Sequence, residues 1–446
     1  MNNATAKLIL KNEPAMGVVA SAARISTQQG TALQIFDKSG DRERDLQLVK
    51  KVLASGHRSV IEHQTFSIAF NDVSVLAEQF AIEFRLASFT VKSRRYVDFS
   101  DAGYVVPDGM NAEVEAIYRR RGEALFADYE RLLALGIPKE DARFVLPYGF
   151  RSNFFVTLNA RELMQMIIAM LYGRGRVFPE LVHLGRQLRE QFDAIYPGVL
   201  DAEMAKAPAE LCEDEGGPIL AGEAREAAIH IVSAPQNPIA ALDVAMRFSG
   251  RFSGFDAESM RALMRDARPR ELEMLNFCFR IDDVSLACVT HFTRHRMLTL
   301  LLRHELSALS EGNYVLPELV QVNTEALAIY QRAFESQAEV AAQAHEAGAS
   351  AQQLAYFAMA GHTTTLMLGM NARALLHFIK LRSCSRAQWE IRGIARAMIE
   401  LVNETDARPI FPGFGPTCAV TGQCPEGKMC CGHPVKIENG IWHIAE

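Results

Sequence analysis

The chain has 446 residues, of which 49% are hydrophobic and 22% are charged, with a formal net charge of -6. This length allows two or three domains with cores of their own, and the negative charge argues against a broad nucleic-acid-binding face while leaving room for a local basic pocket. No hydrophobic run is long enough to cross a bilayer, and the first residues lack the pattern of a signal peptide, so we expect a cytoplasmic protein without membrane contact.

The predicted elements of the first half are short and mixed. A strand leads to a helix, and a second amphipathic helix over 43–56 ends at Gly56, a typical C-cap. The alternating segment TFSIAF (65–70) predicts a strand, and the apolar segment 71–88 after it predicts a helix. A Val-Pro-Asp turn then precedes a long helix over 112–136. Strands are the minority, so the fold class predicted is α+β.

The second half repeats the first. Residues 71–88 (NDVSVLAEQFAIEFRLAS) align without a gap with residues 282–299 (DDVSLACVTHFTRHRMLT). Further blocks align at shifts of 210–212 residues, namely 65–70 with 276–281, 103–108 with 313–318, and 154–165 with 366–377. Convergent helix patterning explains one such match but not several at nearly one shift, so the chain is a tandem duplication.

The boundary between the copies falls in the acidic stretch CEDEGGP (212–218), whose Gly and Pro are typical of a linker. We therefore predict two tandem domains, residues 1–214 and residues 219–446.

A cationic triplet stands out in the second copy. Arg294, His295 and Arg296 follow an apolar helix and precede another apolar run. Such a triplet is costly to bury without anionic partners, so it is either a solvated helix end, a salt-bridge cluster, or a site for a phosphate or an anionic cofactor. The apolar flanks favour the anion site, because the arginine fork binds phosphate bidentately.

A second polar cluster lies in MNARALLHFIKLRSCSRAQWEI (370–391). On a helix, its side chains Asn371, Arg373, His377 and Arg382 line one groove with hydrogen-bond donors. The alternative is an ordinary amphipathic helix with a polar face.

Together these motifs resemble the flavin-dependent thymidylate synthases. GHRSVIEHQTFSIAF (56–70) is similar to that family's His-x-Ser-x-x-Glu-His stretch, and SRRY (93–96) is similar to the end of its Arg-His-Arg…Ser-x-Arg-Tyr signature. TRHRMLT (293–299) is similar to the start of that signature, and 371–392 to the family's Asn-x-Arg-x-Leu-x-His-Phe segment. The resemblance covers both copies, although neither copy has every motif.

The resemblance implies a fold of helices on a small, mainly antiparallel sheet and the reductive methylation of dUMP to dTMP. FAD is the implied cofactor, with NADPH and methylenetetrahydrofolate as co-substrates. Arg294 and Arg382 are the implied catalytic residues. The implied nucleotide-binding residues are His291, Ser93, Arg94, Arg95, Arg294 and Arg382. The implied cofactor-binding residues are Glu62, His63, His295, Arg296, Asn371, Arg373 and His377.

The two copies have lost different parts of the motifs. In copy 1 the Arg-His-Arg positions are Glu83, Phe84 and Arg85, and the position matching Arg382 is Met170. In copy 2 the Glu-His is Glu273 followed by Met274, and HELS (304–307) stands in place of SRRY. The family builds its sites at subunit interfaces, so these complementary losses predict one composite site with residues from both copies.

One departure leaves the substrate open. The family has a further arginine in the segment before Asn-x-Arg, where this chain has Asn153 and Thr365. Arg151 is two residues from the first of these positions and is a candidate substitute. A different pyrimidine nucleotide is therefore an alternative to dUMP, and so is a catalytically dead flavin- or nucleotide-binding protein. We also expect a homo-oligomer, specifically a dimer of the two-repeat chain.

The C-terminal tail is rich in cysteine. Cys418, Cys424, Cys430 and Cys431 are followed by His433, at spacings that differ from the two-residue gap of a zinc knuckle. The alternatives are a structural zinc or other thiophilic metal, a redox or disulfide role, and a Gly-rich tail without a specific role.

Overall fold

The computed structural model describes residues 3–11, 15–205, 219–302, 311–411, 413–432, 435–438 and 441–444, so the predicted linker 212–218 and the HELS segment lie outside the described residues. The chain divides into two compact units. Unit 1 contains Met1–Gly222, Leu309–Gly312 and Pro317–Gly361, and unit 2 contains Glu223–Ala308, Asn313–Leu316 and His362–Glu446. The units therefore follow the two copies except that 219–222, 309–312 and 317–361, from the second copy, belong to unit 1.

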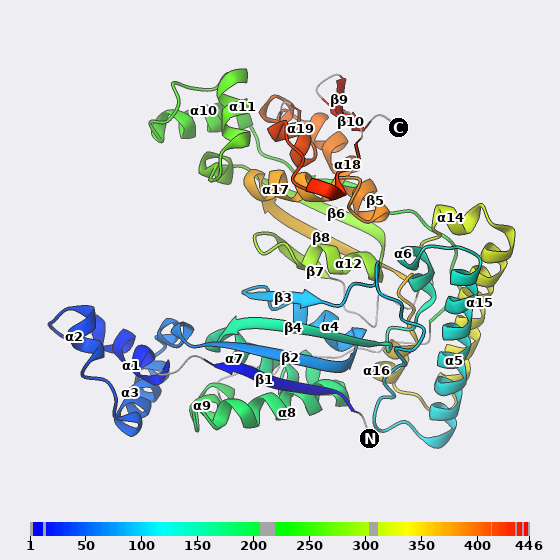
Figure 1. The fold of residues 1–446 in the computed structure, drawn as a ribbon, viewed down its shortest axis with the longest axis horizontal. Helices are drawn as coiled ribbons and strands as arrows, with labels where there is room; N and C mark the ends of the chain where they lie inside the picture. The colour runs from blue at the N-terminus through cyan, green and yellow to red at the C-terminus, as the bar shows by residue number, and fades with distance from the viewer. Residues whose placement is uncertain are drawn as a thin grey trace. The chain divides into compact units, whose positions relative to one another are not determined.

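Each unit is built on a four-stranded antiparallel sheet (Figure 1). In unit 1 the strand order is β1-β2-β4-β3, with β1 (Thr5–Lys11), β2 (Thr65–Ser74), β3 (Ala87–Val91) and β4 (Arg151–Asn159). In unit 2 the order is β5-β6-β8-β7, with β5 (Ala228–Ser233), β6 (Asn276–Ser285), β7 (Thr299–Leu302) and β8 (Thr363–Asn371). The identical topology confirms the predicted tandem α+β fold.

The two sheets share a bulge in the same place. The register shifts between Phe70 and Val73 in β2 and between Ile281 and Val284 in β6. Asp72 and Asp283 lie in these bulges with φ of 52° and 54°, a left-handed conformation that Asp tolerates better than most residues. The Asp-Val-Ser sequence that revealed the repeat is therefore also the sequence of a shared backbone feature.

After each bulge a serine begins a short buried helix, α4 (Val75–Ile82) or α12 (Leu286–Thr293). Ser285 caps α12, and both its N–H and its hydroxyl donate to the buried Glu390 carboxylate, at 2.7 and 2.5 Å. Ser74 makes the same two bonds to Glu180, at 2.7 and 2.6 Å. These carboxylates fix the N-termini of two helices that are apolar over most of their surface and depend on burial for their position.

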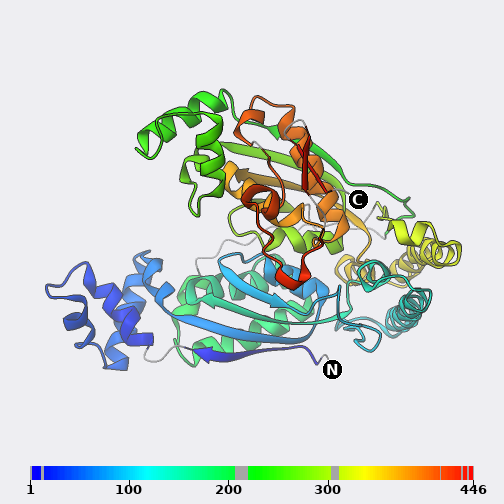
Figure 2. The same ribbon diagram turned by 45° about the horizontal axis from the view of Figure 1, so that its top comes forward.

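Two helices cover one face of each sheet. In unit 1 these are α7 (Ala160–Leu171) and α8 (Pro179–Asp193), and in unit 2 they are α17 (Ala372–Arg382) and α18 (Trp389–Asn403) (Figures 1 and 2). The other helices of unit 1 are α1 (Ala15–Ile25), α2 (Ala32–Phe36), α3 (Arg42–Ala54), η1 (Arg58–His63), α5 (Ala112–Ala134), α6 (Lys139–Ala142), η2 (Arg143–Val145), η3 (Arg174–Val177), α9 (Val199–Met204), α14 (Glu318–Gln321), α15 (Thr324–Glu346), α16 (Ala351–Leu354) and η5 (Ala355–Phe357).

The remaining elements of unit 2 are α10 (Pro238–Phe248), α11 (Ala257–Arg265), η4 (Arg270–Met274), η6 (Arg408–Ile410), α19 (Thr417–Thr421), η7 (Gly427–Met429), β9 (Val435–Glu438) and β10 (Ile441–Ile444). The predicted helix over 43–56 is α3, and it ends close to the expected Gly56.

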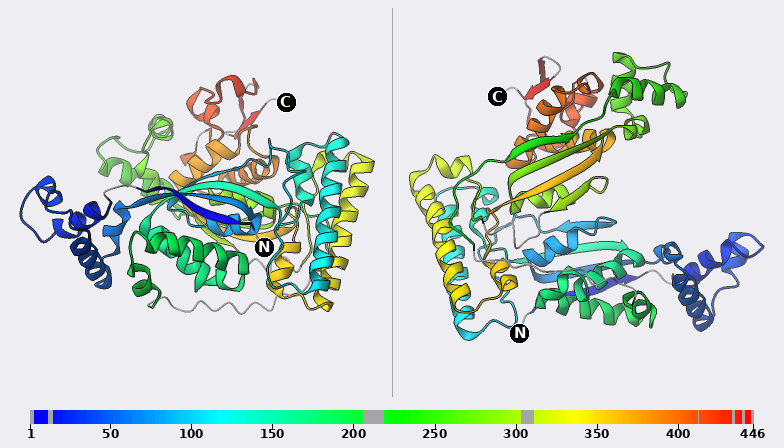
Figure 3. Two further views of the ribbon diagram at one scale, coloured as in Figure 1. Left: turned by 60° about the horizontal axis from the view of Figure 1, so that its bottom comes forward. Right: turned by 180° about the vertical axis from the view of Figure 1, so that it is seen from behind.

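The long helices of the two copies lie side by side within unit 1 (Figure 3). Arg121 of α5 is buried, donates to the Gln337 side chain of α15 at 2.5 Å, and also donates to the carbonyl of Ala333. Burial lowers the pKa of Arg121 to about 10, with Asp128 acting in the opposite direction. This buried polar contact ties the second copy's helix α15 into the first unit.

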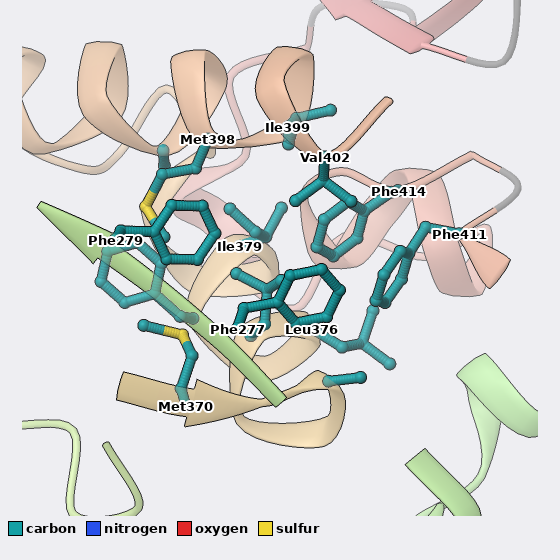
Figure 4. Close-up of a cluster of buried hydrophobic side chains, with 14 of the residues drawn as sticks. Phe277, Phe279, Met370, Leu376, Ile379, Met398, Ile399, Val402, Phe411 and Phe414 are labelled. Atoms are coloured by element: carbon teal, nitrogen blue, oxygen red, sulfur yellow. The ribbon is translucent and has the colours of Figure 1, made fainter. Parts of the chain in front are cut away.

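The core of unit 2 lies between its sheet and its covering helices (Figure 4). Phe277 and Phe279 of β6 pack against Leu376 and Ile379 of α17 and against Met398 of α18. Because this apolar packing fixes one face of α17, the opposite face of the helix presents its polar side chains in a defined position. Among the described residues no helix is long and apolar enough to cross a membrane.

Candidate functional site

A cavity of about 620 Å³ lies in unit 2, within the size range of small-molecule sites. One wall is the turn Arg294–Leu298 after α12, the second is α17, and the third is the segment from Asp266 to Glu273. The lining residues are Asp266, Ala267, Pro269, Glu273, Arg294, His295, Arg296, Met297, Leu298, Asn371, Arg373, Ala374, Leu376, His377 and Lys380. The two clusters predicted from the sequence therefore meet in one cavity.

The first wall is the cationic triplet. Helix α12 is buried throughout and ends at its C-cap, Arg294, so the three residues turn into the cavity where the helix stops. Arg294 and Arg296 line the cavity, and His295 is only 8% exposed. Arg294 and Arg296 are themselves exposed while His295 is buried, so the triplet borders a solvent-open concave space whose two guanidinium groups suit an anion.

His295 is held in a defined protonation state. Its Nε2 accepts a hydrogen bond from Nε of Arg382 at 2.9 Å, so the proton of the neutral ring lies on Nδ1. Its ring also lies 4.9 Å from that of Phe378 and 5.8 Å from that of His377. Burial, together with the nearby Arg382 and His377, lowers the pKa of His295 to about 3. The imidazole is therefore a neutral acceptor at physiological pH.

Arg382 does not line the cavity directly but lies immediately behind it. Besides its bond to His295, it donates from Nη2 to the carbonyl of His291 at 3.1 Å. His291 itself is buried within α12, so its side chain is not among the cavity-lining groups. The predicted pair of arginines is thus arranged with Arg294 at the surface of the cavity and Arg382 one layer deeper, joined to it by the turn at His295.

The wall formed by α17 presents donors along its length. Asn371 caps the helix by accepting from the N–H of Ala374 at 2.9 Å. Arg373, His377 and Lys380 follow at steps of four and three residues and so share one face. Burial lowers the pKa of His377, as do the nearby cations Lys380, Arg382 and Arg373. A neutral His377 on a cationic face is again suited to an anionic ligand.

Carboxylates balance part of this charge. Glu273 pairs with Arg373, and Asp266 pairs with Arg251. A backbone hydrogen bond from Arg268 and the nearby arginines lower the pKa of Asp266. The cavity is therefore lined by four cationic residues, Arg294, Arg296, Arg373 and Lys380, against two carboxylates.

The Glu273–Arg373 pair repeats a pair in unit 1. There Glu62 lies 2.7 Å from Arg161, and the four residues occupy matching positions in the two copies. Copy 2 keeps the glutamate of the Glu-His motif and has Met274 in place of the histidine, and Glu273 forms the same ion pair as its counterpart Glu62. Glu62 is half-buried and His63 is exposed in unit 1.

The rest of the corresponding region of unit 1 is closed by internal contacts. Glu83, which replaces Arg294, pairs with Arg174, whose guanidinium lies 4.9 Å from the ring of Phe80. Met170, which replaces Arg382, is fully buried. It packs so closely on Gly185 that a Cβ added to this glycine would lie only 2.9 Å from the Cβ of Met170. The charge of Glu83 is thus compensated within the protein, and the position that matches Arg382 is filled by an apolar side chain.

The SRRY residues also lie in unit 1. Arg94 is buried and pairs with Glu78, which also accepts from the Ser152 hydroxyl. Arg95 pairs with Glu140 and is partly exposed, and the Ser93 hydroxyl accepts from the N–H of Arg95 at 3.3 Å. The charge of Arg94 is therefore compensated within the fold, while Ser93 and Arg95 lie nearer the surface. Their predicted contacts with a nucleotide remain a prediction.

The cysteine tail packs on α17 through α19. Cys418 is half-buried, whereas Cys424, Cys430 and Cys431 are exposed. Burial raises the pKa of Cys418, as do Cys384 and Cys424. Within the described part of the chain, which leaves out His433, no three His, Cys, Asp or Glu side chains are grouped so that they could hold a metal ion. The predicted zinc site therefore has no support from the described residues.

Three cavity residues were missed by the sequence analysis. Lys380 lies three residues after His377, and helical spacing would have placed it on the same face. Asp266 and Met297 have no comparable signal, because a loop residue's neighbours depend on the tertiary fold.

A tandem α+β fold with an Arg-His-Arg turn that borders a cavity beside an Asn-x-Arg helix defines a class of proteins, and the sequence matches agree with it. The family model of the thymidylate synthase complementing protein matches residues 7–198 and 226–406. The chain belongs to this family and carries its domain twice. The resemblance seen in the sequence is thereby confirmed.

Individual relatives are consistent with this. The flavin-dependent thymidylate synthase of Geobacter sulfurreducens is 34% identical over 171 residues, covering 37% of this chain and 72% of the relative. That of Sulfurisphaera tokodaii is 27% identical over 193 residues, covering 43% and 74%. The names of these relatives confirm the prediction that the chain is an enzyme of this class. A solved UMP/dUMP methylase, PolB from Streptomyces cacaoi with bound 5-Br dUMP, is 22% identical, with a TM-score of 0.38, over 46% of this chain and 96% of that one.

The state of His295 makes unit 2 sensitive to acid. Its pKa is about 3 when folded and about 6.5 when unfolded, so the unfolded chain binds the extra proton between these values. Stability is fully present above pH 6.5 and falls as the pH drops toward 3, by about 2 kcal/mol between pH 7 and pH 5. Urea unfolding at both pH values should show this loss for the wild type and a smaller loss for His295→Phe, the residue found in copy 1. Equal losses in the two proteins would contradict the assignment.

Proposed function

We propose that the protein catalyses the reductive methylation of dUMP to dTMP, using methylenetetrahydrofolate, FAD and NADPH. The observation that carries the proposal is the unit 2 cavity, where the family's Arg-His-Arg turn and its Asn-x-Arg helix form one cationic site. The names of the relatives support the same activity. The predicted cytoplasmic location is part of this proposal.

The cavity residues fit an anionic flavin dinucleotide. The volume of the cavity suits a large ligand. Its lining has four cationic side chains and two carboxylates, and each carboxylate is already paired with an arginine. Arg296, Asn371, Arg373 and His377 would hold FAD, together with Glu62 and His63 of unit 1. When bound, FAD supplies the hydride, while the protein binds and orients the reactants.

The nucleotide would be bound and polarised by Arg294 and Arg382. A guanidinium beside the uracil imide stabilises negative charge that develops on it, which makes the ring a better electrophile. His295 acts as a positioning residue, because its neutral Nε2 directs the Arg382 fork and adds no competing charge. A protonated His295 could not accept that hydrogen bond.

The activity is tested by tritium release from dUMP labelled at C5, with folate and NADPH present. Release that needs all components supports the proposal. A yellow, FAD-loaded protein that releases no tritium would point to the catalytically dead binding protein, and a colourless protein that takes up no FAD would contradict both.

One observation favours a second candidate, an enzyme acting on a different pyrimidine nucleotide. At the positions where the family has a further arginine, Asn153 accepts from the N–H of Asp72 at 3.0 Å and Thr365 donates to Asp282 at 2.9 Å. Both side chains are thus committed to the bulge regions of β2 and β6. Release from labelled UMP that exceeds release from dUMP would favour this candidate.

The composite site is part of the proposal. In it, unit 2 supplies Arg294 and Arg382, and unit 1 supplies Ser93 and Arg95. Arg95→Ala should then lower tritium release at least roughly tenfold, the effect of one lost charge-assisted contact. Arg294→Ala should abolish the same activity. Arg120→Ala, an exposed change on α5, is the control. Full activity in Arg95→Ala would restrict the site to unit 2.

Light scattering tests the proposed dimer of the two-repeat chain.

A further inference from the structure

Helix α17 brings one cation to the cavity that no motif named. Lys380 lines the cavity seven residues after Arg373 and three after His377, on the same helical face. At 1.5 Å per residue, Arg373 and Lys380 lie roughly 10 Å apart along the helix axis. The cationic face therefore continues about one helical turn past His377, to a position that the family segment leaves variable.

The position of Lys380 is fixed from two sides. Its Nζ donates to the carbonyl of Met264 at 2.7 Å, and its own carbonyl accepts from the Thr417 hydroxyl at 3.3 Å. The ammonium group has three N–H donors, and the bond to Met264 uses one of them. Burial lowers the pKa of this half-buried lysine.

The charge of Lys380 differs from that of Arg373 in how it is balanced. Arg373 has the carboxylate of Glu273 as its partner. Among the described residues no carboxylate pairs with Lys380, whose Nζ donates instead to the neutral carbonyl of Met264. A half-buried cation that faces a cavity without a carboxylate is stabilised when an anion enters.

We propose that Lys380 binds a phosphate group of the ligand in this cavity. The inference rests on the proposed function and extends it, since it assigns ligand binding to a residue at a variable position of the recognised segment. The phosphate belongs either to the diphosphate of FAD or to the nucleotide monophosphate. The two ends of the α17 face, Arg373 and Lys380, then hold opposite ends of an extended anionic ligand.

The test compares phosphorylated and unphosphorylated ligands. Dissociation constants for FAD, riboflavin, dUMP and deoxyuridine are measured on the wild type, Lys380→Met and Lys380→Arg. Lys380→Met should weaken one phosphorylated ligand roughly 10- to 100-fold, the value of a charge-assisted hydrogen bond, and leave its unphosphorylated counterpart unchanged. Lys380→Arg should recover most of the affinity. Lys428→Met, in the exposed tail, is the matched control and should bind like the wild type.

The outcomes distinguish the two possible sources of the phosphate, and they distinguish failure of the Lys380 proposal from failure of the proposed function. A selective loss for FAD assigns the diphosphate, and a selective loss for dUMP assigns the nucleotide phosphate. Equal losses for phosphorylated and unphosphorylated ligands, or no loss at all, overturn the proposal, because a purely structural lysine would not distinguish them. If the wild type binds neither flavin nor nucleotide, the proposed function fails. Inorganic pyrophosphate then still tests Lys380. Pyrophosphate should raise the Tm of the wild type but not that of Lys380→Met, and an equal rise in both proteins would contradict the inference.

Discussion

Replacing Arg382 by alanine is expected to lower kcat for nucleotide methylation roughly 100- to 1,000-fold, the usual cost of removing one preorganised donor from an active site. The residue sits behind the cavity and is held by Nε2 of His295 and the carbonyl of His291. Its loss removes the guanidinium proposed to polarise the uracil ring and also the donor that binds Nε2 of His295. Lysine at this position keeps the charge but not the planar fork, so Arg382→Lys should remain strongly impaired.

The measurement is steady-state tritium release, with far-ultraviolet circular dichroism as the check on folding. Arg261→Ala is the matched control, because Arg261 is an exposed arginine on α11 outside the cavity lining. Activity of Arg382→Ala close to that of the control would mean that Arg382 acts only as a structural residue.

The second large effect is on stability. Glu390 is buried at the start of α18 and accepts from both the N–H and the hydroxyl of Ser285. Glu390→Ala leaves these donors unpaired in the interior, and it should lower the free energy of unfolding by about 3–5 kcal/mol, as breaking a buried charged network does. Because Ser285 caps α12, the loss should also disorder the Arg294–Leu298 turn and weaken ligand binding.

Urea denaturation measures the change directly. Glu390→Gln retains one acceptor oxygen and should cost less. Glu400→Ala, on the exposed face of the same helix, should change stability by no more than about 0.5 kcal/mol. Glu180→Ala offers an internal comparison in unit 1, where the carboxylate binds Ser74 in the same way and also accepts from Tyr356 at 2.9 Å. A Glu390→Ala protein as stable as the Glu400→Ala control would show that the network contributes little.

Much of the fold and of the site was predictable because both depend on local sequence. The Asp-Val-Ser bulge, the serine cap and the Asn-Ala-Arg helix start are short patterns with a fixed backbone consequence, and both copies keep them. The Arg-His-Arg turn and the α17 cluster were predicted separately, and the sheet brings them together.

Other features depend on tertiary contacts. The sequence identifies α15 as a helix of the second copy, but the apolar face of a helix does not indicate which of the two units the helix packs in. Its place beside α5 follows from specific partners such as Arg121 and Gln337. Likewise, Glu83 looked like a simple loss in copy 1, and only the position of Arg174 reveals a compensating ion pair.

The placement of Pro317–Gly361 in unit 1 also bears on how this protein can evolve. A duplicated gene can ordinarily be shortened again by deleting either copy, since each encodes a self-sufficient domain. Here a deletion of the second copy would strip the first unit of its α15 partner and expose the buried Arg121 and Tyr118. The second half of the gene therefore cannot be discarded without damage to the unit that the first half mainly encodes.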